Sequence, residues 1–492
     1  MVEYPRGRKA GGLPPPGLNR RKDEKMKKSV VACICCMAAG VALADFQVGF
    51  ARVDMTPPIG TGLSGYFHER ISDGIKDTLD INAVAFSDGT NKAVVISADV
   101  ISLRAYHDLY RKQAAEAAGL PPEAIFIACT HTHTGPVVGA CIYGQTFSTF
   151  DKASTYERFL GERLADAVKL SLADLAPAKL SLARGEAKNI AFVRRYRMKD
   201  GTCRTNPGRN NPDVVGPVGR PDEMVQLVRI DREGRDSIAI VNFQCHPDTI
   251  GGNKISADWP RVVRETVERA IDGVKCVFIN GAQGDTNHYC LDPKLKVPQG
   301  RDVVFRHMGR VVAGAVIGAW DACEPVPAGK VGFYVAPAKV KTNRAAPEEI
   351  PEAQRIMDLY KAGDKLSQIP GTGMQRTTNI AAAKRKLYLK DGPDYFYLPL
   401  SAVTVGDSLA FAGLPGEPFT AYGTALKEKS PFRMTVPACL VNGGFGYLPT
   451  DEALRETGYE TQGSLFTVGL EQTLVNGHLD QLNKLFSEST RH

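Results

Sequence analysis

Two histidines that stand two residues apart, His131 and His133, are the first residues of this sequence whose types and spacing could bind a metal ion. They follow the apolar run 125–129, which is typical of a buried strand, and they precede the turn formers Gly135 and Pro136. Side chains two apart on a strand point to the same side, so both imidazoles would reach one place at the end of the strand. Imidazole is the commonest metal-binding side chain, although the same spacing also occurs in histidines that are satisfied by hydrogen bonds alone.

A third histidine, His246, stands in the same kind of position. The apolar run 238–243 leads into it, and the turn former Pro247 follows. Asp258 precedes the helical pattern that starts at Trp259, and an aspartate at that place is typical of a helix N-cap. Such a residue can cap the helix and also hold a neighbouring ligand in place.

Three further polar segments follow apolar runs. They are the Gly-interrupted loop 280–287, the Pro-Gly-Glu-Pro turn around Glu417, and the Gly-rich stretch that ends in Tyr447 and is followed by Tyr459. Glycine permits close approach of the backbone to a ligand. Each segment taken alone is nevertheless equally typical of a plain turn, a surface carboxylate or a packed tyrosine.

The elements that must position these residues alternate between strands and helices, which indicates an α/β fold. The runs 225–230 and 238–243 are joined by a short polar turn and predict a hairpin, so the sheets should be mixed rather than purely parallel. We expect one large catalytic domain over residues 45–492, with mixed β-sheets flanked by helices, and an exposed helix plus a loop within 343–378. The expected strands lie at 93–98, 125–129, 180–183, 225–230, 238–243, 275–279, 331–335, 395–405, 409–412 and 435–441, and the expected helices at 103–118, 156–175, 259–271, 303–320 and from 419 and 465.

Composition and charge argue against several classes of protein. Hydrophobic residues make up 43% of the chain and charged residues 23%, as in ordinary globular proteins, which argues against a collagen, a coiled coil or a largely disordered chain. The formal net charge is +7, but residues 1–44 hold nine Lys and Arg against three Asp and Glu, so the remainder is close to neutral. A nucleic-acid-binding surface needs clustered surplus Lys and Arg, and we therefore expect no nucleic-acid partner.

The order of the polar segments along the chain is more specific than any one of them. His-x-His, a second histidine, Gln-Gly-Asp, Pro-Gly-Glu and a late Gly-rich tyrosine segment follow one another as in the neutral (non-lysosomal) ceramidases. The opening 49–57, GFARVDMTP, is also similar to the start of that family. The chain thus resembles the catalytic domain of the neutral ceramidases over residues 46–466, without the further β-sandwich domain that larger members carry.

This resemblance implies one catalytic zinc ion, which activates water for amide hydrolysis. Nitrogen and oxygen ligands suit zinc, and a catalytic site keeps an open position for water. His133 would face the substrate or steady the water, and Arg194 would hold the oxygen of the polarised carbonyl. The resemblance makes the zinc ligands His131, His246, Glu417 and Tyr459, and the catalytic residues His133, Arg194, Asp285 and Asn287.

One position departs from the family pattern. The ceramidases supply a catalytic serine in a Gly-Asp-x-Ser loop, and here Asn287 stands at the serine position, with Thr286 one residue before it. An amide cannot act as a nucleophile, although it can orient water or an oxyanion. We therefore expect the attack to come from zinc-activated water.

The leading interpretation is an exported zinc-dependent hydrolase, most simply an amidohydrolase that cleaves an N-acyl (ceramide-like) amide in a small-molecule or lipid substrate. A lipid substrate would bring transient contact with a membrane surface. The first alternative is a zinc esterase or another hydrolase that uses the same site. The second is a non-catalytic secreted binding protein that keeps the fold. Measuring the zinc content would distinguish the binding protein from the two hydrolases. Comparing activity on amide and ester substrates would distinguish the amidohydrolase from the esterase.

The N-terminus has the layout of a secretory signal peptide. A cationic segment starts at Met26, the apolar run 30–41 follows, and an A-x-A cleavage pattern ends at Ala44. We expect residues 26–44 to be removed and the protein to be exported, to the periplasm or outside the cell. Residues 1–25 are expected to be unstructured or to precede the true start of translation. No later stretch reaches the ~18 uninterrupted apolar residues of a membrane helix.

N-terminal sequencing of the protein from its native cells should give a mature chain that begins at Asp45, because cleavage follows the A-x-A pattern. A chain that begins at Cys33 would instead indicate cleavage of the lipoprotein type. A chain that begins at Met1 or Met26 would contradict export through this signal.

Overall fold

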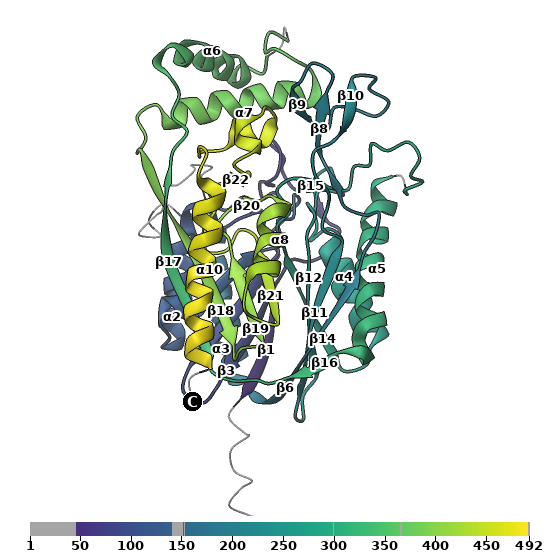
Figure 1. Cartoon of the computed structure of the whole chain (residues 1–492), viewed down its shortest axis with the longest axis vertical. Coiled ribbons are helices and arrows are strands. Elements are labelled where there is room, and N and C mark those ends of the chain that lie inside the picture. Colours follow the sequence, from purple (N-terminus) through teal and green to yellow (C-terminus); the bar gives the residue numbers. More distant parts are fainter. Residues whose placement is uncertain (1–45, 140–150, 152, 299, 365–366, 491–492) are drawn as a thin grey trace, which may run out of the picture. The chain divides into compact units, whose positions relative to one another are not determined.

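Two mixed β-sheets form the centre of the protein, as the sequence predicts (Figure 1). The computed structural model describes residues 46–139, 151, 153–298, 300–364 and 367–490, so the expected signal peptide and the residues before it lie outside this range. The pairs β4–β5, β12–β14 and β19–β21 are parallel, and the other pairs of these sheets are antiparallel. The larger sheet comprises, in spatial order, β14 (Val274–Asn280), β12 (Ser237–Phe243), β11 (Met224–Arg232), β6 (Ala176–Glu186), β1 (Gln47–Asp54), β3 (Asp80–Ser87), β4 (Lys92–Ala98) and β5 (Ile125–Cys129), with β16 (Glu324–Val326) paired to β6. The smaller sheet comprises, in spatial order, β17 (Val331–Lys341), β18 (Tyr395–Val405), β19 (Leu409–Gly413) and β21 (Met434–Ala438).

The carboxyl ends of strands from the two halves of the larger sheet meet. The halves are joined where β1 pairs with β6 through two residue pairs. At the other end, Ser97 Oγ in β4 donates to the backbone oxygen of Phe278 in β14 at 2.5 Å, and Asn280 Nδ2 donates to the backbone oxygen of Thr130 at 3.0 Å. The ends of β5, β12 and β14 therefore lie together, which is the kind of place where α/β proteins form their sites.

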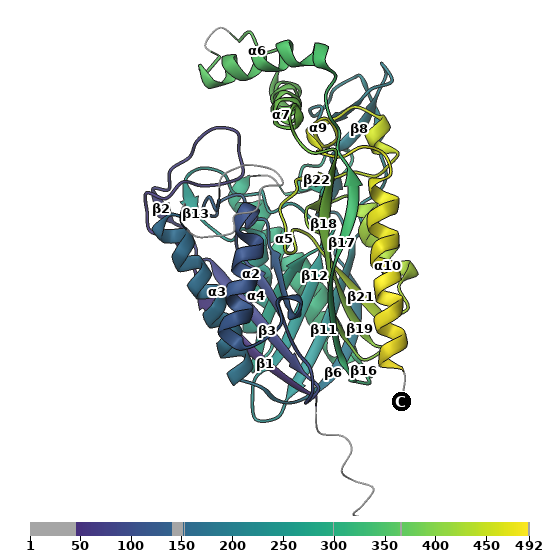
Figure 2. The same ribbon diagram turned by 90° about the vertical axis from the view of Figure 1, so that its left-hand side faces the viewer.

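Helices cover the outer faces of both sheets (Figure 2). Phe86 and Phe126 of the larger sheet pack on Phe411 of the smaller one, with ring centroids 5.9 and 6.3 Å apart. Strands such as β5 are buried on both faces, which explains their continuous apolar runs. No helix in the described ranges is both long and apolar enough to cross a bilayer. The covering helices are α2 (His107–Ala118) and α3 (Thr155–Ala173) beside β1 and β5, α4 (Trp259–Ala270) and α5 (Arg301–Ala319) beside β14 and β11, and α8 (Thr420–Lys429) and α10 (Leu470–Ser489) on the smaller sheet.

Local sequence signals set the ends of several helices. Ser154 and Glu157 form a capping box at the start of α3, and Gly119, with φ of 64°, ends α2. Asp258 accepts a hydrogen bond from the backbone nitrogen of Trp259 at 2.6 Å, which confirms it as the N-cap of α4.

Two helices form an insertion between β17 and β18 at one end of the protein. They are α6 (Ile350–Lys361) and α7 (Gly373–Leu389), and α7 lies near the short strands β8 (Arg195–Met198) and β9 (Cys203–Thr205) in Figure 1. The sequence predicts one exposed helix here, and the second is missed. The reason is composition, because α7 starts after a Gly-Thr-Gly stretch and has no clear apolar stripe. It packs on α6 and on the short helix α9 (Tyr459–Gly463).

Gly49 in β1 leaves no room for a side chain against the end of α3. A Cβ there would lie 1.9 Å from the backbone oxygen of Ser171 and 2.9 Å from the backbone nitrogen of Leu175, and neither atom can turn aside. Gly49→Ala should therefore lower the free energy of unfolding by about 1–3 kcal/mol, measured by urea denaturation. Gly216→Ala is the control, because a Cβ there meets nothing within 4 Å. Equal unfolding midpoints for the two variants would contradict this close packing.

Candidate metal centre

Two histidines at strand ends, His131 after β5 and His246 after β12, turn the same nitrogen toward a common point. Nδ1 of His131 lies 2.8 Å from the backbone oxygen of Ile101, and Nδ1 of His246 lies 2.9 Å from the backbone oxygens of both Gln283 and Thr286. A carbonyl oxygen only accepts hydrogen bonds, so Nδ1 carries the proton in both rings. With Nδ1 occupied in this way, Nε2 is the nitrogen of each ring that is left to bind a metal, as in metal-binding histidines.

Glu417 brings a carboxylate oxygen to the same point. It opens the short strand β20 (Glu417–Pro418), which pairs in parallel with β22 (Tyr447–Leu448). Its Oε2 lies 3.3 Å from Nε2 of His131 and 3.2 Å from Nε2 of His246. That oxygen is buried, and no group among the described residues donates a hydrogen bond to it. Gly284 permits this arrangement, because a Cβ there would come within 2.3 Å of the Glu417 backbone oxygen.

His133 adds a third imidazole. Its Nε2 lies 3.4 Å from Nε2 of His131, and the three histidines offer ligand atoms that all lie within 4.8 Å of one another. On the other side of the ring, Nδ1 lies 3.7 Å from Oδ1 of Asp248, and that oxygen accepts a hydrogen bond from the hydroxyl of Tyr66. Tyr66 is exposed, whereas His133 is buried. His133 therefore stands between the buried ligand atoms and the surface.

Electrostatics at this point favour a bound cation. Burial, with Arg194 adding to the effect, lowers the pKa of His246 to about 3, and burial together with His131 lowers the pKa of His133 well below its ordinary value. With the proton of each ring on Nδ1, Nε2 of His131 and of His246 brings a lone pair, not a hydrogen, to the buried Oε2 of Glu417. An ionised carboxylate that faces neutral nitrogen lone pairs is balanced by a cation. The donor set therefore fits a divalent metal ion.

Two tyrosines stand beside Glu417. Tyr447 is its partner in the β20–β22 pair, and the Tyr447 ring lies 6.4 Å from that of His246. Tyr459, the expected ligand, opens α9, and its ring centroid is 5.4 Å from that of Tyr447. Burial, followed by the charge of Glu417, raises the pKa of both tyrosines, so neither hydroxyl ionises by itself near neutral pH. From the sequence, Tyr447 is interpreted only as a packing residue. The strands β20 and β22 that bring it beside Glu417 have two residues each, too few to show an alternating pattern in the sequence.

Arg194, expected at the substrate, is buried beside the histidines. Its Nε forms an ion pair with Oε1 of Glu460 at 2.7 Å, one terminal nitrogen donates to the backbone oxygen of Gly284 at 2.8 Å, and the other lies 3.4 Å from Nε2 of His246. Thr205 donates to the second carboxylate oxygen of Glu460 at 2.7 Å. These contacts fix the plane of the guanidinium. The role of Glu460 is not predicted, because a carboxylate in a polar stretch is typical of the surface.

Asp285 and Asn287 make contacts that hold the loop 284–287 in place. Oδ1 of Asp285 accepts from the backbone nitrogen and the hydroxyl of Thr420 at 2.8 Å each, at the start of α8. Oδ1 of Asn287 accepts from the backbone nitrogen of Tyr289 at 3.0 Å, and its Nδ2 lies 3.4 Å from Oδ1 of Asn206. The hydrogen bonds described for these two side chains do not involve the three histidines.

His131→Ala and His246→Ala should each abolish zinc uptake, because each removes a nitrogen from the common point. Elemental analysis after dialysis against zinc should fall from about one ion per chain to near zero, with an unchanged circular dichroism spectrum. His307→Ala, a histidine on α5 away from the centre, is the control and should keep its zinc. Wild-type zinc content in either ligand variant would show that the ligands are different.

Comparison with known proteins supports the resemblance. No protein-family model matches the chain. A neutral ceramidase of Mycobacterium tuberculosis is 30% identical over 177 residues, which span 35% of this chain and 25% of that protein. The solved neutral ceramidase of Pseudomonas aeruginosa has a TM-score of 0.68 at 16% identity and covers 91% of this chain and 75% of its own. A ceramidase complexed with C2 has a TM-score of 0.65 at 16% identity and covers 90% and 76%. The predicted resemblance to the neutral ceramidases is thus confirmed, in sequence over 35% of the chain and in fold over 91% of it.

Proposed function

We propose that this protein is a zinc-dependent hydrolase that cleaves an N-acyl amide with water as the nucleophile. The observation that carries the proposal is the convergence of Nε2 of His131, Nε2 of His246 and Oε2 of Glu417 at 3.2–3.3 Å. A zinc ion held there would lower the pKa of a water molecule toward neutrality and polarise a substrate carbonyl. Tyr459 completes the ligand set in this proposal.

Arg194 binds the oxygen of the substrate carbonyl in this proposal. Glu460 and Gly284 occupy two of its nitrogens, and the remaining one lies 3.4 Å from Nε2 of His246 and faces the centre. A guanidinium fixed in this way needs no rearrangement when negative charge develops on the oxygen. The protonated hydroxyl of Tyr447, beside Arg194, is a second donor to the same oxygen.

His133 moves the proton from the attacking water to the leaving amine. Its Nε2 faces the ligand atoms, and its Nδ1 faces Asp248 toward the surface. A neutral imidazole in that position can accept a proton at Nε2 and release it to a leaving group within hydrogen-bonding reach. The carboxylate of Asp248 stabilises the ring while it carries the proton.

The surroundings of the centre support water as the nucleophile. The hydroxyl of Thr286 lies 3.3 Å from the backbone oxygen of Gln283, and the Thr286 carbonyl accepts from His246. Burial raises the pKa of the Cys245 thiol and also that of Cys439, so neither forms the thiolate that attack would need. The Thr286 hydroxyl is thus held by a backbone oxygen and both thiols stay protonated, which supports hydrolysis without a covalent acyl intermediate.

The substrate class rests on the relatives. A ceramidase, by its name, acts on ceramide, which is an N-acyl amide, and the two solved relatives share the fold over most of their length. The amide in this proposal belongs to a small molecule or a lipid, and a lipid would bring transient contact with a membrane surface. Export after cleavage at Ala44 would place the protein where such lipids are exposed.

Zinc-loaded protein should hydrolyse a fluorogenic N-acyl amide, lose this activity on treatment with a chelator and regain it with added zinc. Arg194→Gln should lower kcat about 10²–10³-fold with zinc content unchanged, because a donor to the developing charge is lost. Arg197→Gln, an exposed arginine of β8, is the control and should keep full activity.

A matched ester should be run beside the amide. Cleavage of the ester alone would favour an esterase. Zinc binding without turnover of either substrate would favour a binding protein, and each of these results would overturn the proposed amidohydrolase.

A further inference from the structure

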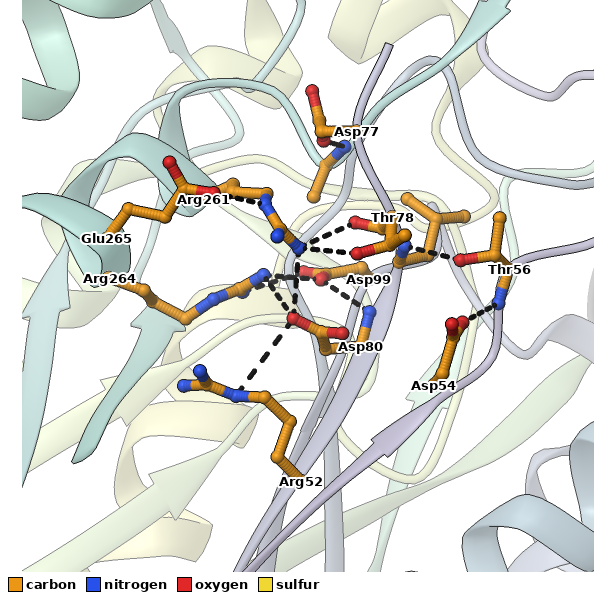
Figure 3. Close-up of polar contacts among 12 residues, drawn as sticks. Arg52, Asp54, Thr56, Asp77, Thr78, Asp80, Asp99, Arg261, Arg264 and Glu265 are labelled. Atoms are coloured by element: carbon orange, nitrogen blue, oxygen red, sulfur yellow. Dashed lines mark hydrogen bonds and ion pairs between the residues drawn. The ribbon is translucent and has the colours of Figure 1, made fainter. Parts of the chain in front are cut away.

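A buried ion pair connects α4 to the end of β4 (Figure 3). Arg264 donates to both carboxylate oxygens of Asp99, at 3.0 and 2.6 Å, and both side chains are almost completely buried. Arg261 and Glu268 share this face of the helix, since residues three and four apart are neighbours on a helix. Arg261 reaches Asp80 at 3.1 Å. The side of α4 that meets the larger sheet therefore carries charged residues beside its buried apolar ones, Trp259, Val263 and Val267.

Asp99 is the centre of this network. Besides the two bonds from Arg264, its carboxylate accepts from the backbone nitrogen of Asp80 at 2.9 Å and from the hydroxyl of Thr130 at 3.2 Å. Thr130 directly precedes His131, so this bond ties the first ligand segment to the end of β4. Four donors on one carboxylate leave the 99–101 segment little freedom to move.

The 99–101 segment in turn holds His131. The backbone nitrogen of His131 donates to the oxygen of Val100 at 3.0 Å, and Nδ1 donates to the oxygen of Ile101 at 2.8 Å. His131 has a φ of 72°, in the left-handed region that non-glycine residues avoid. Such a conformation costs on the order of 1–3 kcal/mol and persists only where the surroundings enforce it.

The start of α4 holds the second ligand segment. Its N-cap, Asp258, accepts from the backbone nitrogens of Thr249 and Ile250 at 2.9 and 3.0 Å. The indole nitrogen of Trp259 donates to the backbone oxygen of His246 at 3.4 Å. One helix thus contacts the segments of both histidines, through its N-cap on one side and through Arg264 on the other.

A stability role does not explain this pair. Taking a guanidinium and a carboxylate out of water is costly, and apolar residues of similar volume often give equal or greater stability. One of the four hydrogen bonds to Asp99, the one from Thr130, reaches the ligand segment directly, and Arg264 holds the carboxylate that accepts it. We propose that Asp99 and Arg264 are positioning residues of the metal centre, which hold His131 in the conformation that binds the ion. This inference rests on the metal centre of the proposed function.

Arg264→Met and Asp99→Asn should each weaken zinc affinity about 10-fold or more, measured by competition with a chelator, as losses of residues that support metal ligands do. The visible absorption spectrum of the cobalt-substituted protein should also change, because His131 no longer holds its position. Glu268→Gln is the matched control. Glu268 lies on the same face of α4 but pairs with Arg52 at 2.7 Å and has no bond to Asp99 or Thr130. It should lower the melting temperature while leaving zinc affinity and the cobalt spectrum unchanged.

The double variant Asp99→Asn/Arg264→Met should have the same zinc affinity as whichever single variant binds zinc less tightly, because the two residues act as one unit. Thr130→Val keeps the shape of the side chain and removes only the bond to Asp99, so it should weaken affinity severalfold even if the charge variants do not fold. Folded variants of Asp99, Arg264 and Thr130 with wild-type zinc affinity would overturn this inference. A wild-type protein that binds no zinc would overturn the proposed function itself.

Discussion

The rest of this structure depends on a small group of atoms that repel one another. Oε2 of the Glu417 carboxylate lies 3.3 Å from Nε2 of His131 and 3.2 Å from Nε2 of His246, and each of these nitrogens carries a lone pair. Atoms of this kind stay together only if a cation lies between them or if the surroundings hold them rigidly. The support comes first from backbone carbonyls, which accept a hydrogen bond from the Nδ1–H of each ring and so orient Nε2 toward the common point. The ligand geometry is therefore set by main-chain atoms at strand ends.

That requirement explains the buried charges around the centre. Arg194 with Glu460 on one side, and Asp99 with Arg264 on the other, are almost fully buried ion pairs. Pairs of this kind contribute little net stability, but they fix orientation because breaking them leaves a charge without a partner. Asp285 serves the same end in another way, since its carboxylate anchors the loop that supports His246 to the start of α8.

The sequence predicts the class of the fold and the order of the motifs because both are written in local patterns. Continuous apolar runs identify fully buried strands such as β5, whereas β1 and β3 are not among the expected strands, and Asp258 is recognisable as an N-cap from its place before a helical pattern. The helix α7 is missed because its core contacts come from a neighbouring insertion helix and not from a regular apolar stripe. Tyr447 is missed as a site residue because a two-residue strand carries no period.

The sequence by itself determined which chemistry is available here, because the imidazoles, the carboxylate and the turn residues that expose them are properties of short segments. It also determined their resemblance to the neutral ceramidases, which lies in the order of those segments. Only the tertiary structure decided that Glu417 faces both histidines, that Asp285 anchors a helix, and that α4 contacts the segments of both His131 and His246. These relations join residues far apart in the chain, and they arise from how the two halves of the larger sheet meet, which no local pattern encodes.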